Sequence, residues 1–181
     1  ALAEAPRQSM LAVDHRSRPL RVERWIPQSS SKDGLWVLMM PGLGGDPDHF
    51  NWLARSLMQA GWPVVVLKHP GSDAASVQAL LEGRQSFDGA SALRDRLADL
   101  VAVLDAQQRG DLNIPGTEGV LMGHSLGALT AILASGAQPV PGMEQRCEAA
   151  LAGLPLTNLS ELLQCELAAG RVLEGNACLL Y

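Results

Sequence analysis

The sequence has no excess of positive charge. Its 14 Lys and Arg residues are outnumbered by 19 Asp and Glu residues, which gives a formal net charge of −5 at pH 7. The arginines of residues 94–109 are interleaved with aspartates, so no face accumulates the positive stripe that binds nucleic-acid phosphates. We therefore expect no nucleic-acid partner.

Cysteine is scarce as well. Cys147, Cys165 and Cys178 are widely and unequally spaced, and no C-x-x-C pair or His-rich segment accompanies them as a zinc site would require. We interpret them as small core residues. A single disulfide between two of them is the alternative, so the cysteines do not decide the redox compartment. No metal and no organic cofactor is expected.

No hydrophobic run predicts a membrane span. Residues 119–137 carry no formal charge and are nearly long enough, but four glycines, two serines, a threonine and a histidine dilute them. A strand turning into a helix accounts for that composition. The opening ALAEAP resembles the small-residue end of a signal peptide, but no apolar stretch precedes it. We expect a cytoplasmic protein, with a periplasmic or secreted one as the alternative, and leave the oligomeric state open.

The order of elements predicts an α/β fold in one domain over residues 1–181. An opening β-hairpin is expected at 9–14 and 20–26. Further strands are expected at 35–40, 63–68 and 119–122, and helices after Asp46, at 74–82, around 93–104 and at 126–137. In the helix around 93–104, leucines recur at helical spacing and the charges are expected on the opposite face. Such alternation favours a mostly parallel sheet with helices on both faces.

Residues 123–127, GHSLG, form the pattern G-x-S-x-G. Because the pattern follows a predicted strand and opens a predicted helix, Ser125 is expected at a strained turn that exposes its hydroxyl. Gly123 and Gly127 would let the flanking elements approach without Cβ clashes. The N–H of Leu126 would point toward the place where a tetrahedral intermediate develops its negative oxygen.

A second motif, PGLGG, ends the strand predicted at 35–40. With Gly42 and Gly44 on either side, the N–H of Leu43 is bare enough to act as a second donor to an oxyanion. Each motif alone is also compatible with an ordinary tight turn. Together, in this order, they favour a serine nucleophile with an oxyanion hole.

From residue 20 to about 143 the chain resembles the α/β-hydrolase superfamily. The segments MMPGLGG, LKHPGSD and GHSLGA resemble its dienelactone-hydrolase-like and platelet-activating-factor-acetylhydrolase-like branch. The resemblance implies an α/β-hydrolase fold and hydrolysis of a small-molecule acyl ester, with Ser125 as nucleophile. Two departures matter: Pro41 stands where many members have histidine, and dienelactone hydrolases proper use a cysteine nucleophile, so dienelactone is not the expected substrate.

A triad base is missing after the serine. In this superfamily the acid and then the histidine follow the nucleophile, but neither a histidine nor an aspartate follows Ser125. Upstream, His49 and His69 are candidates for lining the pocket, and His69, after a strand, is the better candidate for a base. Even so, loop hydrogen bonding or substrate contact is the expected role of His69. His124 is expected to pack beside the sheet.

The last residues, VLEGNACLLY, stop within an apolar run. We interpret this as a truncated chain whose remaining strands, acid and histidine are absent, so that the chain as given shows little turnover. Residues 143–170 would form a lid or insertion, or else an ordinary amphipathic core helix. The predicted function is a serine carboxylic ester hydrolase. The alternatives are an acyltransferase or thioesterase with the same nucleophile, and a non-catalytic hydrolase-like binding protein.

Overall fold

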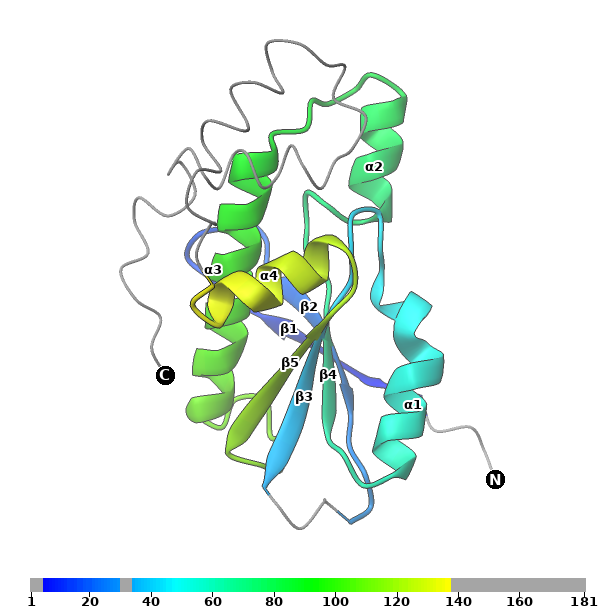
Figure 1. Cartoon of the computed structure of the whole chain (residues 1–181), viewed down its shortest axis with the longest axis vertical. Helices are drawn as coiled ribbons and strands as arrows, with labels where there is room; N and C mark the ends of the chain where they lie inside the picture. The colour runs from blue at the N-terminus through cyan, green and yellow to red at the C-terminus, as the bar shows by residue number, and fades with distance from the viewer. Residues whose placement is uncertain (1–4, 30–33, 138–181) are drawn as a thin grey trace.

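The computed structural model describes residues 5–29 and 34–137 as one mixed sheet with helices packed against it (Figure 1). The strands are β1 (Arg7–Leu11), β2 (Leu20–Trp25), β3 (Leu35–Met40), β4 (Val64–Leu67) and β5 (Glu118–Gly123). The helices are the 3-10 helix η1 (Pro47–Phe50), α1 (Asn51–Gln59), α2 (Ala74–Leu81), α3 (Gly89–Gln108) and α4 (Leu126–Ala134).

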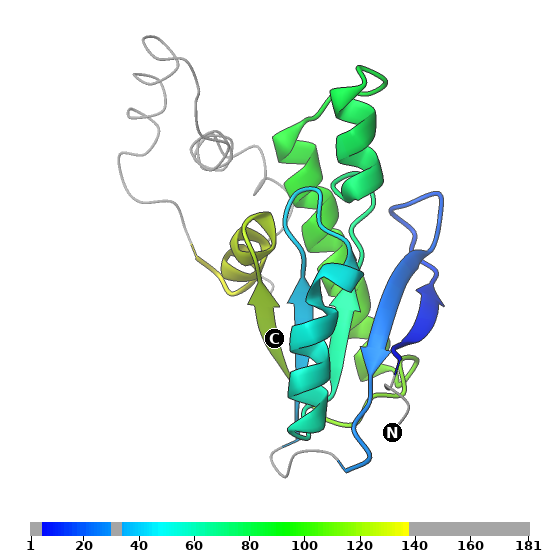
Figure 2. The ribbon, with the colours of Figure 1, turned by 90° about the vertical axis from the view of Figure 1, so that its right-hand side faces the viewer.

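The strand order is β1-β2-β4-β3-β5. Strands β4, β3 and β5 are parallel, whereas β2 runs antiparallel to both β1 and β4. The predicted hairpin, the mostly parallel centre and the strand–helix alternation are therefore confirmed. Figure 2 shows the arrowheads of β3, β4 and β5 at the same end of the sheet, which places the loops that follow them together.

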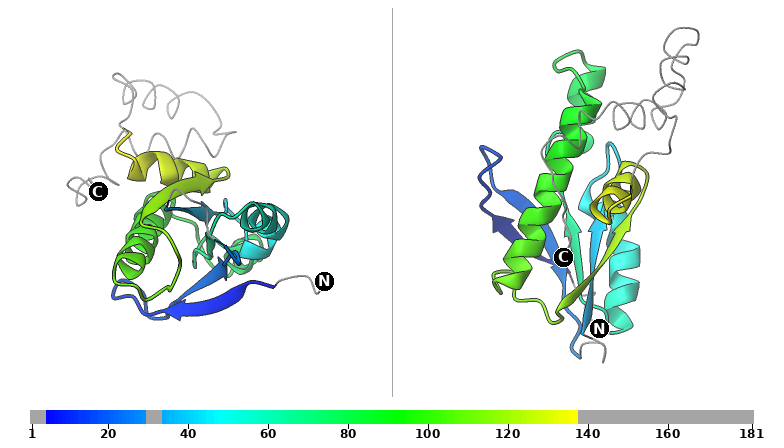
Figure 3. Two further views of the ribbon diagram at one scale, coloured as in Figure 1. Left: turned by 90° about the horizontal axis from the view of Figure 1, so that it is seen from below. Right: turned by 60° about the vertical axis from the view of Figure 1, so that its left-hand side comes forward.

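Two apolar layers cover the sheet because side chains of a strand alternate between its faces. On one face, Val37, Met39, Val64 and Val66 pack against α1 through Ala54 and Met58. On the other face, the even-numbered residues of β3 and the odd-numbered residues of β4 pack against α3 and α4. The two views of Figure 3 show α1 on the side of the sheet opposite to α3. The predicted helices on both faces are confirmed.

Burial differs from the prediction in two elements. Strand β5 was expected to be buried, but Val120 is 39% exposed because β5 is one of the two edge strands of the described sheet. In α3 the leucine stripe forms as predicted, yet Arg96 and Asp99 are only 1% and 0% exposed. The prediction that the charges of this helix face outward is wrong at these two positions.

Several sequence-based expectations lie outside the described residues. These are the three cysteines, the lid or core helix at 143–170 and the continuation of the sheet beyond β5. Within the described part, no helix has both the length and the apolar character that crossing a bilayer needs. The segment 119–137 is divided between β5, a turn and α4.

Candidate active site

Ser125 occupies the turn between β5 and α4. Its backbone has φ 53° and ψ −120°, and among the described non-glycine residues only Asn113 shares a positive φ. Such a conformation costs about 1–3 kcal/mol and persists only where the surroundings enforce it. The Ser125 residue is exposed, as expected for a hydroxyl that meets a substrate.

The glycines on either side of Ser125 are sterically required. A Cβ atom on Gly123 would overlap the backbone of Gly127, and a Cβ atom on Gly127 would overlap the carbonyl of Met40 at the end of β3. The turn is thus pressed against both its own helix and the neighbouring strand. Only glycine at these two positions permits that approach.

The loop that follows β3 lies directly beside Ser125. A Cβ atom on Gly42 would be 2.9 Å from the Cβ of Ser125, so the two segments are in contact. Within the described part of the chain, the N–H groups of Leu43 and Leu126 have no hydrogen-bond acceptor. Leu126 is the first residue of α4, where N–H groups lack an intrahelical partner. Both predicted oxyanion donors are therefore unpaired, one in the loop after β3 and the other at the start of α4.

A cavity of about 350 Å³ opens at this place. It is lined by residues 42–45, by His49 and Phe50, and by His124 and Ser125. A larger cavity of about 890 Å³ lies between α3 and β5, but it contains none of the predicted site residues. The smaller cavity is the one that joins the serine, the glycine-rich loop and two imidazoles.

The upstream histidines occupy different environments. His49 lines the cavity, and its Nδ1 accepts a hydrogen bond from the N–H of Asp46 at 3.3 Å. His124 is exposed and lines the same cavity, whereas the sequence suggested packing beside the sheet. His69, expected at the pocket, is 2% exposed and does not line this cavity. Among the described residues no histidine is hydrogen-bonded to the Ser125 hydroxyl.

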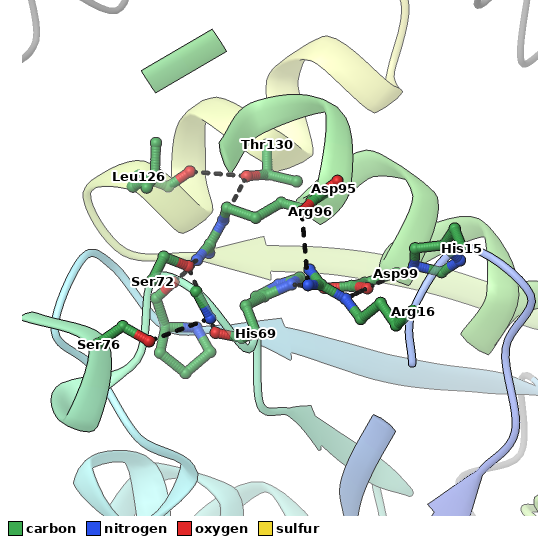
Figure 4. A network of polar contacts seen from close by, with 12 residues as sticks. His15, Arg16, His69, Ser72, Ser76, Asp95, Arg96, Asp99, Leu126 and Thr130 are labelled. Atoms are coloured by element: carbon green, nitrogen blue, oxygen red, sulfur yellow. Dashed lines mark hydrogen bonds and ion pairs between the residues drawn. The ribbon is translucent and has the colours of Figure 1, made fainter. Parts of the chain in front are cut away.

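Asp99 of α3 is the centre of a polar cluster that joins the hairpin loop to the loop after β4 (Figure 4). Its carboxylate accepts hydrogen bonds from Arg16 at 2.6 and 2.8 Å, contacts His15 Nε2 at 2.7 Å and contacts His69 Nδ1 at 2.9 Å. Burial opposes ionisation of Asp99, but the hydrogen bonds from His69 and Arg16 outweigh it and lower its pKa to about 2. Asp99 is therefore a carboxylate at neutral pH.

The ionised Asp99 fixes the state of His69. Because a carboxylate only accepts hydrogen bonds, the proton of the neutral ring is on Nδ1. Burial and the charge of Arg96 lower the pKa of His69 to about 4, and the hydrogen bond to Asp99 offsets this only in part. His69 is thus a neutral structural donor here, and its buried Nε2 has no partner among the described residues.

Arg96 of α3 reaches the loops that follow β3 and β4 and the helix α4. Its Nε donates to the Thr130 hydroxyl of α4 at 3.1 Å, its Nη1 donates to the Ser72 hydroxyl at 2.7 Å and its Nη2 donates to the carbonyl of Pro41. Burial lowers the pKa of Arg96 to about 10, while the charge of Asp99 opposes that shift. The guanidinium is therefore still charged at neutral pH.

Sequence reasoning missed this cluster, although one signal was present. The leucine stripe of α3 recurs at 93, 97, 100 and 104, and a helix of 3.6 residues per turn places residue 96 within the same stripe. A charged residue inside an apolar stripe indicates a buried, paired group. Within the described residues, no group of three or more His, Cys, Asp and Glu side chains forms a candidate metal site.

Comparison with known proteins yields structural neighbours only. No family model and no curated protein matches the chain. A ferulic acid esterase from Streptomyces cinnamoneus is similar in structure, with a TM-score of 0.57 and 18% identity over 71% of this chain and 54% of the esterase. Esterase 2 of Thermogutta terrifontis phosphorylated by paraoxon has a TM-score of 0.49 and 14% identity over 73% and 48%.

A further neighbour is an α/β serine hydrolase without a lid from Xanthomonas campestris. Its TM-score is 0.47, with 21% identity over 74% of this chain and 58% of that protein. The chain therefore spans about half the length of these neighbours. Only the ferulic acid esterase has a TM-score above 0.5 among these three neighbours, and at 18% identity its likeness establishes the fold alone.

Proposed function

We propose, from the premise that this chain has the α/β-hydrolase fold, that it is a serine hydrolase of carboxylic esters acting through an acyl-enzyme on Ser125. The observation that carries the proposal is the position of Ser125. It occupies a strained, exposed turn in contact with the loop of Leu43, and the N–H groups of Leu43 and Leu126 are both unpaired. Acyl transfer requires a nucleophile with nearby donors for a developing oxyanion, and the contact between these segments together with the two unpaired N–H groups supports that role.

In the proposed reaction the Ser125 Oγ attacks the ester carbonyl carbon while a base takes its proton. The carbonyl electron pair moves onto oxygen, and the N–H groups of Leu43 and Leu126 stabilise that negative charge. Collapse of the tetrahedral intermediate expels the alcohol, which receives the proton from the base. Water then attacks the acyl-serine in the same way and releases the acid. Loss of one such N–H donor typically costs about 100- to 1,000-fold in kcat.

No histidine among the described residues is hydrogen-bonded to the Ser125 hydroxyl. We expect an acid and a histidine downstream of Ser125 in the full-length protein. The present 181 residues alone are then expected to show little turnover, because a serine hydroxyl is a weak nucleophile without a base. His49 and His124, which line the cavity of Ser125, are the alternatives. Replacing His49 and His124 by alanine distinguishes the two sources: activity is lost if one of them is the base and kept if the base is a downstream histidine.

A fluorophosphonate probe and a p-nitrophenyl ester test the proposal on the full-length protein. We expect the probe to label Ser125, and Ser125→Ala to abolish both labelling and ester hydrolysis. The matched control is Ser135→Ala, at the exposed end of α4, which should behave like the wild type. An unlabelled protein with no esterase activity would instead favour the non-catalytic binding protein. Faster acyl transfer to a thiol or alcohol than to water would favour the acyltransferase or thioesterase.

A further inference from the structure

We infer that Arg96 is the positioning residue of the oxyanion hole: its guanidinium holds the loop bearing the Leu43 N–H in place relative to the helix bearing the Leu126 N–H. The inference rests on the proposed function, because it concerns the geometry of the same site. Arg96 lies on α3, outside both loops, and touches neither Ser125 nor the cavity that contains it.

On one side, Arg96 fixes the glycine-rich loop at two points. It donates directly to the carbonyl of Pro41, the residue that precedes Gly42. It also donates to the side chain of Ser72, whose own carbonyl accepts the N–H of Gly44 at 2.8 Å. The peptide that carries the Leu43 N–H lies between these two anchored points, so its direction depends on both.

On the other side, Arg96 fixes the first turn of α4. The Thr130 hydroxyl that accepts from Arg96 Nε donates in turn to the carbonyl of Leu126 at 2.8 Å. Leu126 is the residue whose N–H is the second proposed donor. One guanidinium therefore connects the two segments that carry the proposed donors. Figure 4 shows its hydrogen bonds to Thr130 on one side and to Ser72 on the other.

The residue type fits this task. The guanidinium is planar and spreads its N–H donors over a rigid fork, and here Nε, Nη1 and Nη2 each serve a different structural element. A lysine ammonium is a compact group on a flexible stem and would not hold the three acceptors at once. Arg96 is 1% exposed, so water cannot replace the bonds when they are lost. Asp99 supplies a compensating negative charge nearby.

The test compares Arg96→Met, Arg96→Lys and the control Arg94→Met in the full-length protein. Arg94 is exposed on the same helix, and no hydrogen bond or ion pair of its side chain is found among the described residues. The rate of ester hydrolysis is divided by the concentration of reactive Ser125, which is determined in a separate sample by complete labelling with the fluorophosphonate. This normalisation removes misfolded molecules from the comparison. An arylboronic acid, which forms a tetrahedral adduct on the serine, reports on the oxyanion hole itself.

We expect Arg96→Met to lower kcat per labelled site by roughly ten- to a hundredfold, with KM changed by less than about twofold, because misplaced donors weaken transition-state binding. The boronic acid Ki should rise by a similar factor. Arg96→Lys should fall between wild type and Arg96→Met, and Arg94→Met should equal the wild type. Unchanged kcat per labelled site in Arg96→Met, with only a lower thermal stability, overturns the inference.

Ser72→Ala provides a milder variant in case Arg96→Met does not fold. It removes one acceptor of Arg96 and keeps the carbonyl that binds Gly44. We expect a smaller loss of kcat that disappears in the Arg96→Met or Arg96→Lys background, because both residues act through one contact. Fully additive losses contradict the inference. If the wild type is neither labelled nor inactivated by Ser125→Ala, the proposed function itself fails, and the role of Arg96 in an oxyanion hole fails with it.

Discussion

Replacing His69 by asparagine is expected to remove much of the acid sensitivity of this fold. Asparagine places an amide N–H near the position of Nδ1, so the hydrogen bond to Asp99 can be kept without a titrating ring. In the native protein His69 is neutral, because burial, with the charge of Arg96, lowers its pKa from 6.5 to about 4. The unfolded chain binds the proton at the ordinary pKa, which makes unfolding more favourable as the pH falls.

The size of the effect follows from the two pKa values. His69 contributes no penalty well above pH 6.5, and stability is lost as the pH falls from 6.5 to about 4. At about 1.4 kcal/mol for each pH unit, the whole loss is about 3 kcal/mol, of which about 2 kcal/mol falls between roughly pH 7 and pH 5. Asp99, with its pKa lowered to about 2, adds its own loss only below its ordinary value of 3.8.

Urea unfolding followed by tryptophan fluorescence measures this loss, since Trp25 and Trp36 are 1% and 2% exposed and report on the core. The wild type should lose about 2 kcal/mol between about pH 7 and pH 5, and His69→Asn should lose markedly less over that range. His49→Asn, at a surface histidine, is the control and should follow the wild type. Equal losses in the wild type and His69→Asn would show that this ring is not the acid-sensitive group.

Two further substitutions test the packing of the site. Gly127→Ala places a Cβ atom against the Met40 carbonyl and should cost several kcal/mol of stability or prevent folding. Its control is Gly71→Ala, at φ +89° with open space around it, which should cost about 1 kcal/mol. Urea unfolding midpoints compare the two variants. Asp99→Asn leaves the buried Arg96 and the part-buried Arg16 without their counter-charge and should cost about 3 kcal/mol or more. Asp95→Asn, at a side chain that is 52% exposed, should stay within about 0.5 kcal/mol. Similar losses for both members of either pair would contradict the assigned packing.

The elements of the fold were predictable because they depend on local patterns. Strand β3 (Leu35–Met40) has the bounds predicted, since an apolar run between polar loops leaves little alternative. The hairpin, the long helix α3 and the elbow helix α4 also lie where periodicity and the turn residues indicated them. The G-x-S-x-G turn is equally local, because the clash that demands glycine arises between neighbouring elements of one strand–turn–helix unit.

The neighbours of each element were not predictable from those patterns. The run at 119–122 is typical of a fully buried strand, yet β5 is an edge strand of the described sheet, because strand order is decided by long-range pairing. For the same reason, the sequence made His69 the better candidate for a base, but it is His49 that lies at the cavity. Both follow strands in sequence, but only His49 lines the cavity of Ser125, while His69 points to Asp99 thirty residues away.

The sequence by itself determined the nucleophile turn, the glycine-rich loop and the alternation of strands and helices, because each depends on residues close together in the chain. Tertiary structure alone decided that Arg96 and Asp99 are buried and which groups they hold. Their partners come from the hairpin loop, from β3, from the loops after β4 and from α4, and no local pattern specifies such distant acceptors. A buried charge is tolerated only when its whole set of partners has assembled, and that assembly is a property of the folded chain.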